Sequence, residues 1–173
     1  MSISAAFPIV EAHRVQLRKV ELSDAPFFLG LLNDPSWISN IGDRGVRSEA
    51  DAESYIRDKI WTQYGAYGYG MYLVELKSTT APIGICGLVK RAYLSAPDLG
   101  FALLPDYTGQ GYATEAARSL ISHVRASLGI GKLYAIAKRG NDRSTRVLDR
   151  LGFRHEGPCL TEQGVEVELY ASI

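Results

Sequence analysis

The chain has 173 residues and carries 19 Lys and Arg against 19 Asp and Glu, which gives a formal net charge of +0. This balance provides no general attraction to nucleic acid or to an anionic membrane, so neither is expected as a partner. The length suits one domain over residues 1–173, and 46% hydrophobic residues suffice for a core without disulfide bonds.

The two cysteines, Cys86 and Cys159, form no disulfide framework, and no Cys and His residues have the spacing of zinc ligands. No metal is therefore expected, and both thiols are interpreted as small apolar side chains. Residues Met1–Val10 lack the regions of a signal peptide, and no apolar run is long enough to span a bilayer. A cytoplasmic location is the expectation that follows.

The first predicted elements are a strand and two helices. Arg14–Val20 alternates charged and apolar residues, which is typical of a half-buried strand. Asp24 is a suitable N-cap for a helix that Pro35 is expected to end. The apolar face of this helix carries Phe27, Phe28, Leu31 and Leu32. Ser48, with Asp51 three residues later, predicts a second helix that opens in a capping box. Its apolar positions are Ala52, Tyr55, Ile56 and Ile60.

The remaining elements alternate between strands and helices. After a passage rich in Gly and Tyr at Tyr64–Tyr72, the predicted elements are strands at Met71–Leu76, Ile83–Val89 and Asp98–Leu104, a helix at Tyr112–Leu128, a strand at Leu133–Ala137, a helix at Asn141–Leu151, and a closing hairpin from Phe153 that includes Val165–Tyr170. This order indicates a mixed α/β fold, in which a meander precedes a βαβ unit.

The candidate for chemistry is the turn Thr108–Ala113, called the glycine loop below. A strand runs into this loop, and the loop opens a helix. Free N–H groups at a helix N-terminus bind anions, with help from the helix dipole. Gly109 and Gly111 permit positive φ and a close approach to phosphate, and Thr114 adds a hydroxyl. The pattern predicts a pyrophosphate cradle.

Other interpretations of the glycine loop are weaker. No Lys-Ser or Lys-Thr pair follows, so it is not a Walker A motif. Thr114 stands at the third glycine position of a dinucleotide fingerprint, which argues against that motif. On the two glycines alone, a plain tight turn stays open.

The glycine loop resembles the acetyl-CoA motif of the GNAT superfamily of N-acetyltransferases, Arg/Gln-x-x-Gly-x-Gly/Ala, with Gly111 and Ala113 in its last two specified positions. Thr108 departs from the Arg or Gln often found before the first glycine. Further segments resemble other family motifs: Leu17-Arg18, Ile83-Gly84, Gly87-Leu88, Asn141–Ser144, Val147-Leu148 and Leu151–Phe153. The branch that it resembles most contains the ribosomal-protein N-terminal acetyltransferases.

The resemblance implies a central mixed, mostly antiparallel, twisted sheet of about six to seven strands flanked by about four helices. It implies that this sheet splays between the Asp98–Leu104 and Leu133–Ala137 strands, with the pantetheine arm of acetyl-CoA in the gap. The cofactor-binding residues that it implies are Phe101, Leu103, Leu104, Gly109, Gln110, Gly111, Tyr112, Ala113, Thr114, Asn141 and Ser144. The backbone N–H of Leu103 would face the thioester oxygen.

Proton transfer suggests further candidates. A lysine-type amine, with a pKa of about 10.4, needs a base at neutral pH, whereas an α-amine near 7.7–8.0 needs little help. Asp98 and Glu75 on predicted strands are the candidate bases. Many family members place a tyrosine acid where this chain has Leu148. Ser144 shares a helix face with Leu148 and is the candidate donor to the leaving thiolate, with local bonding at the helix start as the alternative.

The predicted function is acetyl transfer from acetyl-CoA to a small-molecule or peptide amine, by direct attack in a ternary complex, in a monomer or homodimer. The alternative, favoured by the missing tyrosine, is a non-catalytic acetyl-CoA-binding module or sensor; a nucleotide-phosphate-binding protein is disfavoured by the missing lysine. The tyrosines of the Tyr64–Tyr72 passage line an acceptor pocket or simply pack. The three histidines, His13, His123 and His155, are interpreted as surface or structural residues.

Overall fold

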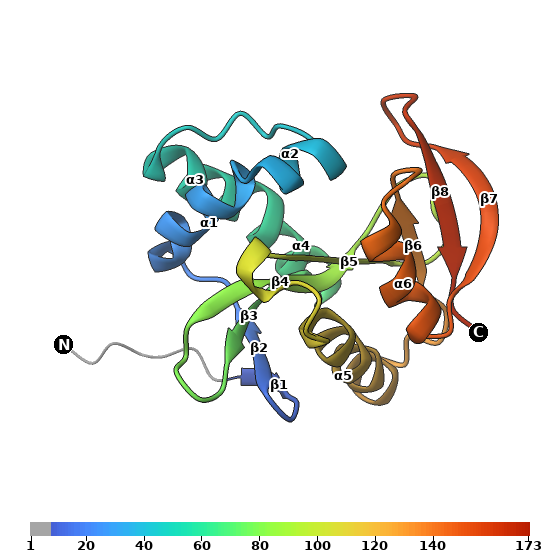
Figure 1. The fold of residues 1–173 in the computed structure, drawn as a ribbon, viewed down its shortest axis with the longest axis horizontal. Helices are drawn as coiled ribbons and strands as arrows, with labels where there is room; N and C mark the ends of the chain where they lie inside the picture. Colours follow the sequence, from blue (N-terminus) through green and yellow to red (C-terminus); the bar gives the residue numbers. More distant parts are fainter. Residues whose placement is uncertain (1–7) are drawn as a thin grey trace.

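The structure, a computed structural model, describes residues 8–173 (Figure 1). Its strands form one eight-stranded sheet in the order β1-β2-β3-β4-β5-β6-β8-β7. The strands are β1 (Pro8–Glu11), β2 (Val15–Lys19), β3 (Met71–Leu76), β4 (Pro82–Val89), β5 (Asp98–Leu103), β6 (Tyr134–Ala137), β7 (Arg154–Leu160) and β8 (Glu166–Ala171). Every neighbouring pair is antiparallel except β5 and β6, which run parallel.

The helices follow the predicted order, with two additional helices at Pro35–Asn40 and Thr62–Tyr67. They are α1 (Ala25–Leu32), α2 (Pro35–Asn40), α3 (Glu49–Tyr55), α4 (Thr62–Tyr67), α5 (Tyr112–Leu128) and α6 (Asp142–Arg150), with short 3₁₀ turns at Leu22–Asp24 and Pro105–Tyr107. A π-helical segment, Ile56–Trp61, joins α3 to α4, so that this helix continues to Tyr67. The predicted fold class is confirmed. The sheet has one strand more than predicted, because the four-residue edge strand β1 is too short to show an alternating pattern.

The first helix ends before Pro35, as the sequence predicted, and Pro35 also begins a second helix, α2, that the sequence did not predict. The preceding helix stops at Leu32, and Asp34 caps α2 by accepting a hydrogen bond from the N–H of Ser36 at 2.9 Å. Proline suits the first helical position, because its missing N–H has no partner there in any case. The predicted capping box is confirmed, since Ser48 and Asp51 exchange side-chain to backbone hydrogen bonds of 3.1 and 3.0 Å.

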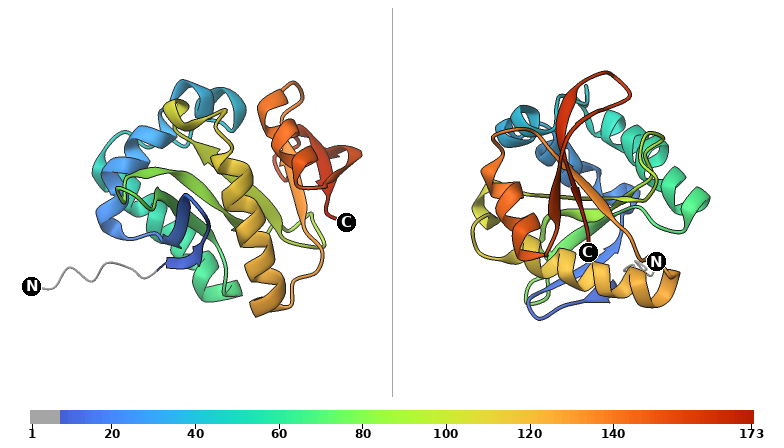
Figure 2. Two further views of the ribbon diagram at one scale, coloured as in Figure 1. Left: turned by 60° about the horizontal axis from the view of Figure 1, so that its bottom comes forward. Right: turned by 90° about the vertical axis from the view of Figure 1, so that its right-hand side faces the viewer.

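Two apolar cores cover the two faces of the sheet. One lies between the sheet and α5 and includes Leu120, Val124 and Leu99. The other lies between the sheet and the N-terminal helices and includes Phe28 and Ile56. Figures 1 and 2 show α5 and the α1–α3 layer on opposite sides of the sheet. The loop that precedes α5 therefore sits at the edge of one layer, beside β5.

The sheet opens between β5 and β6. Only Asp98 and Tyr134 are aligned between these strands, with the N–H of Tyr134 donating to the carbonyl of Pro97 at 2.8 Å. Other neighbours in the sheet share three or more aligned pairs, and beyond Asp98 the two strands diverge (Figure 1). The expected splay is confirmed.

Within residues 8–173, no helix combines the length and hydropathy needed to cross a membrane. The same residues contain no group of three or more His, Cys, Asp or Glu side chains arranged to hold a metal ion. The expectation about a signal peptide rests largely on Met1–Phe7, which lie outside the described residues.

Candidate active site

The glycine loop leaves the start of α5 open. Gly109 and Gly111 adopt positive φ of 74° and 85°, and Gly111 is the N-cap of this 17-residue helix. Because Gly111 has no side chain, no side-chain cap occupies the first N–H groups of the helix. Those of Tyr112, Ala113 and Thr114 therefore remain available to an anion.

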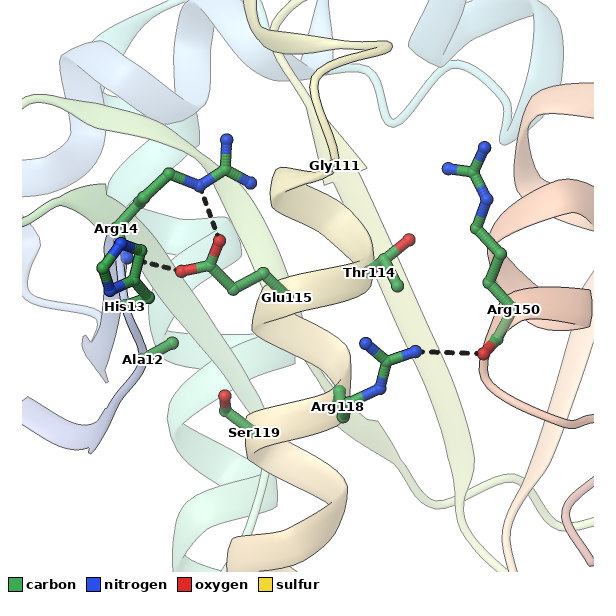
Figure 3. Close-up of a pocket in the computed structure, with 9 residues that line it drawn as sticks. All are labelled: Ala12, His13, Arg14, Gly111, Thr114, Glu115, Arg118, Ser119 and Arg150. Carbon is green, nitrogen blue, oxygen red and sulfur yellow. Dashed lines mark hydrogen bonds and ion pairs between the residues drawn. The ribbon is translucent and has the colours of Figure 1, made fainter.

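A pocket of about 480 Å³ lies beside this helix start (Figure 3). Its walls are the β1–β2 turn, the first two turns of α5 and the last residue of α6. Thr114 lines it and is only 8% exposed, yet its Oγ1 has no hydrogen-bond partner among the described residues. A buried hydroxyl without a partner is costly, so a bound group that supplies the partner is favoured here.

The charge of the pocket is positive. Among the described residues that line it, His13, Arg14, Arg118 and Arg150 are basic and Glu115 alone is acidic. Glu115 pairs with Arg14 at 2.7 Å. Arg118 donates from Nη2 to the backbone carbonyl of Arg150 at 3.1 Å, which ties α5 to α6. Guanidinium groups around an open helix N-terminus suit a ligand that carries phosphates.

The edge of β5 that faces the splay carries free backbone groups. The N–H of Leu104 donates to the carbonyl of Ile83 at 2.8 Å, so Leu104 and, by alternation, Ala102 bond to β4. The N–H groups of Phe101 and Leu103 then point toward β6, which has already diverged. Of the predicted backbone contacts, Phe101 and Leu103 are therefore accessible, while Leu104 has its N–H engaged.

Asp98 lies at the point where the two strands part. It is 2% exposed, and its Oδ2 accepts from Nε of Arg91 at 2.7 Å, while Oδ1 has no hydrogen-bond partner within residues 8–173. Burial raises the pKa of Asp98 to about 6, against the opposing effects of Arg91 and of the Ile136 N–H on β6. A carboxyl group with such a pKa and one free oxygen is suited to accept a proton near neutral pH.

Helix α6 begins at Asp142, shortly after the end of β6, the strand on the other side of the gap from β5. Asn141 is the N-cap, and its Oδ1 accepts from the N–H of Ser144 at 3.3 Å, which leaves the amide NH₂ as its donor. Ser144 is half-buried, and its hydroxyl makes no hydrogen bond to the described part of the chain. Leu148 is 1% exposed within the α5-side core, so no hydroxyl stands at that position.

A second pocket, of about 380 Å³, separates the end of α2 from the start of α6. Ser36, Ser39 and Asn40 line one side, and Gly140–Arg143 line the other. Lys138 donates from Nζ to the carbonyl of Ser39 at 2.9 Å beside it. The sequence contained no signal that these segments meet, because they lie about 100 residues apart.

Comparison with known proteins decides the family. Residues 14–154 match the family model described as an acetyltransferase (GNAT) domain. The chain belongs to the GNAT family of N-acetyltransferases. The resemblance and the predicted enzyme class are confirmed.

Relatives of this GNAT chain include YkkB of Bacillus subtilis, 29% identical over 147 residues that cover 82% of this chain and 83% of that protein. The spermidine N(1)-acetyltransferase of Escherichia coli is 26% identical over 156 residues, covering 87% of this chain and 78% of that protein. The structure of RimL, a ribosomal-protein α-N-acetyltransferase, in complex with coenzyme A has a TM-score of 0.81 at 20% identity and covers 96% of this chain and 98% of RimL. At 20% identity, the similarity to RimL shows a shared fold.

Other candidate residues in this GNAT chain have structural partners. Glu75 accepts from Gln16 at 2.6 Å and from Arg18 at 3.2 Å, so both its oxygens are engaged. Tyr64 stacks on Tyr72 with ring centroids 5.6 Å apart. This contact favours a packing role for these tyrosines rather than a role in lining an acceptor pocket. Burial raises the pKa of Cys86 to about 12, as expected for an apolar thiol.

The histidines differ from one another. His13 is exposed and lines the pocket beside α5, whereas Nε2 of His155 lies 2.6 Å from a carboxylate oxygen of Glu168. His123 lies 3.5 Å from Ser127 within the same helix. The interpretation as surface or structural residues therefore fits all three histidines, and His13 also lines the pocket.

The sequence did not indicate Arg14, Glu115 and Arg91 as site residues. Their positions follow from tertiary contacts, since Arg14 and Glu115 are separated by 101 residues. The one signal for Arg91 was its place seven residues before Asp98, across a loop whose path the sequence did not indicate.

Proposed function

We propose that this GNAT N-acetyltransferase uses acetyl-CoA as co-substrate and acetylates a primary amine by direct attack in a ternary complex. The observation that carries the proposal is the unpartnered, buried hydroxyl of Thr114 in a cationic pocket at the open start of α5. The size of the pocket and its three arginines suit the phosphate-bearing part of CoA. The complex of RimL with coenzyme A, which shares this fold, supports the choice.

The chain would hold the cofactor along one continuous path. The amides of Gly109, Gln110, Gly111 and the first turn of α5 bind the diphosphate. The free backbone groups of Phe101 and Leu103 bond to the pantetheine arm along the unpaired edge of β5. The amide NH₂ of Asn141 donates to an amide carbonyl of the same arm.

Three groups would act on the reacting atoms. Asp98 takes the proton that the amine loses as its nitrogen bonds to the thioester carbon, with the free Oδ1 as acceptor. The N–H of Leu103 stabilises the charge on the carbonyl oxygen. As the C–S bond breaks, the hydroxyl of Ser144 donates to the departing thiolate, and the positive end of the α6 dipole favours the same charge.

The acceptor is proposed as a small-molecule or peptide amine. The names of the relatives include a spermidine acetyltransferase and a ribosomal-protein acetyltransferase, which represent these two classes. A panel that contains spermidine and an N-terminal peptide distinguishes them by CoA release. Release with no amine of a broad panel would instead support the non-catalytic binding module. The cytoplasmic location and the monomeric or dimeric state stay predictions.

Acetyl-CoA is expected to raise the melting temperature of the protein, because it binds the native state and not the unfolded chain. At a ligand concentration of 100 times Kd the stabilisation is about 2.7 kcal/mol. ATP and NAD lack the pantetheine arm and are expected to have much smaller effects. Differential scanning fluorimetry with the three ligands at equal concentration makes the measurement. Equal shifts with all three would contradict a dedicated CoA site.

Replacing Ser144 with alanine is expected to lower kcat and kcat/KM together, by roughly ten- to a hundredfold, while the Kd for acetyl-CoA changes little. A hydrogen bond to a charged group contributes about 1.5–3 kcal/mol, and this one forms mainly as the thiolate develops. Steady-state kinetics and calorimetry on one preparation test it. Ser122→Ala on α5 is the matched control, since that serine only bonds back to its own helix. Unchanged kcat with a lower melting temperature would reduce Ser144 to a helix-start residue.

A further inference from the structure

The glycine loop has no cation of its own. Residues 108–113 include no Lys or Arg. The polar side chains of the loop turn back on the preceding residues, since Thr108 donates to the carbonyl of Pro105 and Gln110 donates to that of Asp106, each at 2.8 Å. A diphosphate bound by this loop would therefore find backbone N–H groups within it but no cationic side chain.

Arg14 brings a positive charge to the loop from a distant part of the chain. It lies in the turn between β1 and β2 and donates from Nη1 to the carbonyl of Gln110 at 3.0 Å. Its guanidinium lies 4.3 Å from the centre of the Tyr112 ring. A Cβ atom added at Gly111 would lie 3.3 Å from Nη2, so this amino group is at the N-cap of α5.

Glu115 fixes the orientation of Arg14. One carboxylate oxygen accepts from Nε at 2.7 Å, and the other accepts from the backbone N–H of the same arginine at 2.5 Å. The pKa of Glu115 is lowered, because these bonds outweigh the raising effect of its burial. The Nη2 group keeps no hydrogen-bond partner within residues 8–173, and the Arg14 side chain is 41% exposed, so its donors are open to a ligand.

We propose that Arg14 is a further cofactor-binding residue, which donates from Nη2 to the diphosphate of acetyl-CoA, and that Glu115 is the residue that positions it. The inference rests on the proposed function, since it assigns a contact to the same cofactor. Figure 3 shows Arg14 and Glu115 beside the open start of α5, near Gly111. The ion pair thus presents its remaining donors at the place where the free helix N–H groups also point.

The test is calorimetry of Arg14→Gln with CoA and with 3′-dephospho-CoA. The variant is expected to bind both about ten- to a hundredfold more weakly, and by the same factor, because both ligands contain the diphosphate. Arg57→Gln removes an equal charge from an exposed helical ion pair elsewhere and is expected to leave both Kd values unchanged. A loss confined to CoA would assign Arg14 to the 3′-phosphate and overturn the proposal.

If Arg14 only joins the β1–β2 turn to α5 and does not contact the cofactor, a different result is expected. Arg14→Gln would then lower the melting temperature without ligand and leave both Kd values intact at low temperature, which would also overturn the proposal. If the wild-type protein binds neither ligand, the proposed function itself fails.

The double-mutant cycle with Glu115→Gln tests the positioning role. In the wild-type background, Glu115→Gln is expected to weaken CoA binding several-fold, because Arg14 loses its fixed orientation. In the Arg14→Gln background, Glu115→Gln is expected to weaken CoA binding no further, because no arginine remains to be positioned. The loss of the negative charge of Glu115 beside the diphosphate also acts against further weakening. Additive effects of the two substitutions on Kd would contradict the coupling.

Discussion

The Asp98→Asn variant is expected to lose about 10²- to 10⁴-fold in kcat, the range that a positioned general base contributes. The isosteric amide keeps the buried volume and can still bond to Arg91, but it accepts no proton. In the wild-type protein, activity should fall as the pH drops through about 6, where Asp98 becomes protonated and can no longer act as a base. That acidic limb of the kcat profile is expected to vanish in the variant, which leaves only the ionisation of the amine itself.

Two companion variants make the assignment specific. Arg91→Gln removes the cation that opposes the effect of burial, so the acidic limb should move to higher pH. Glu75→Gln alters another buried strand carboxylate, one whose oxygens are already engaged, and should lower the melting temperature with the limb in place. The profiles are measured with the most active amine of the panel. An acidic limb of the kcat profile that persists in Asp98→Asn would show that another group causes it.

The Gly111→Val variant is expected to weaken acetyl-CoA binding by at least about a hundredfold and to leave the fold largely intact. The residue has φ of 85°, a conformation that costs a non-glycine residue roughly 1–2 kcal/mol, and a β-branched side chain raises this cost. The added carbons would also occupy the space between Arg14 and the free helix N–H groups, 3.3 Å from Nη2. Isothermal titration calorimetry with acetyl-CoA gives the Kd, and circular dichroism reports the fold.

Gly129→Val is the control for backbone strain. Gly129 ends the same helix with φ of 66°, and a Cβ there meets no atom within 4 Å. It should lower stability by a similar amount while the Kd for acetyl-CoA stays unchanged. If Gly111→Val binds acetyl-CoA as the wild type does, the diphosphate site lies elsewhere.

Local patterns predicted most of the fold. The bounds of β3 and α5 match the predicted ranges Met71–Leu76 and Tyr112–Leu128, because hydrophobic periodicity and the flanking glycines act within a few residues. Pro35 shows the limit of such signals. A proline disfavours helical backbone in the residue before it and suits the first position of a helix, so Pro35 both follows the end of α1 and begins α2. The sequence indicated only the first of these roles.

The sequence alone was enough to predict the mixed α/β class, the glycine loop at the start of a helix and the resemblance to the GNAT family. These depend on residues that are neighbours in the chain. The folded chain was needed to show that Arg14 and Glu115 flank that loop, that Arg91 shares the buried site of Asp98, and that the edge of β5 is unpaired. Burial, ion pairing and a shifted pKa are properties of groups that folding brings together, and residues 101 positions apart carry no local sign that they will meet.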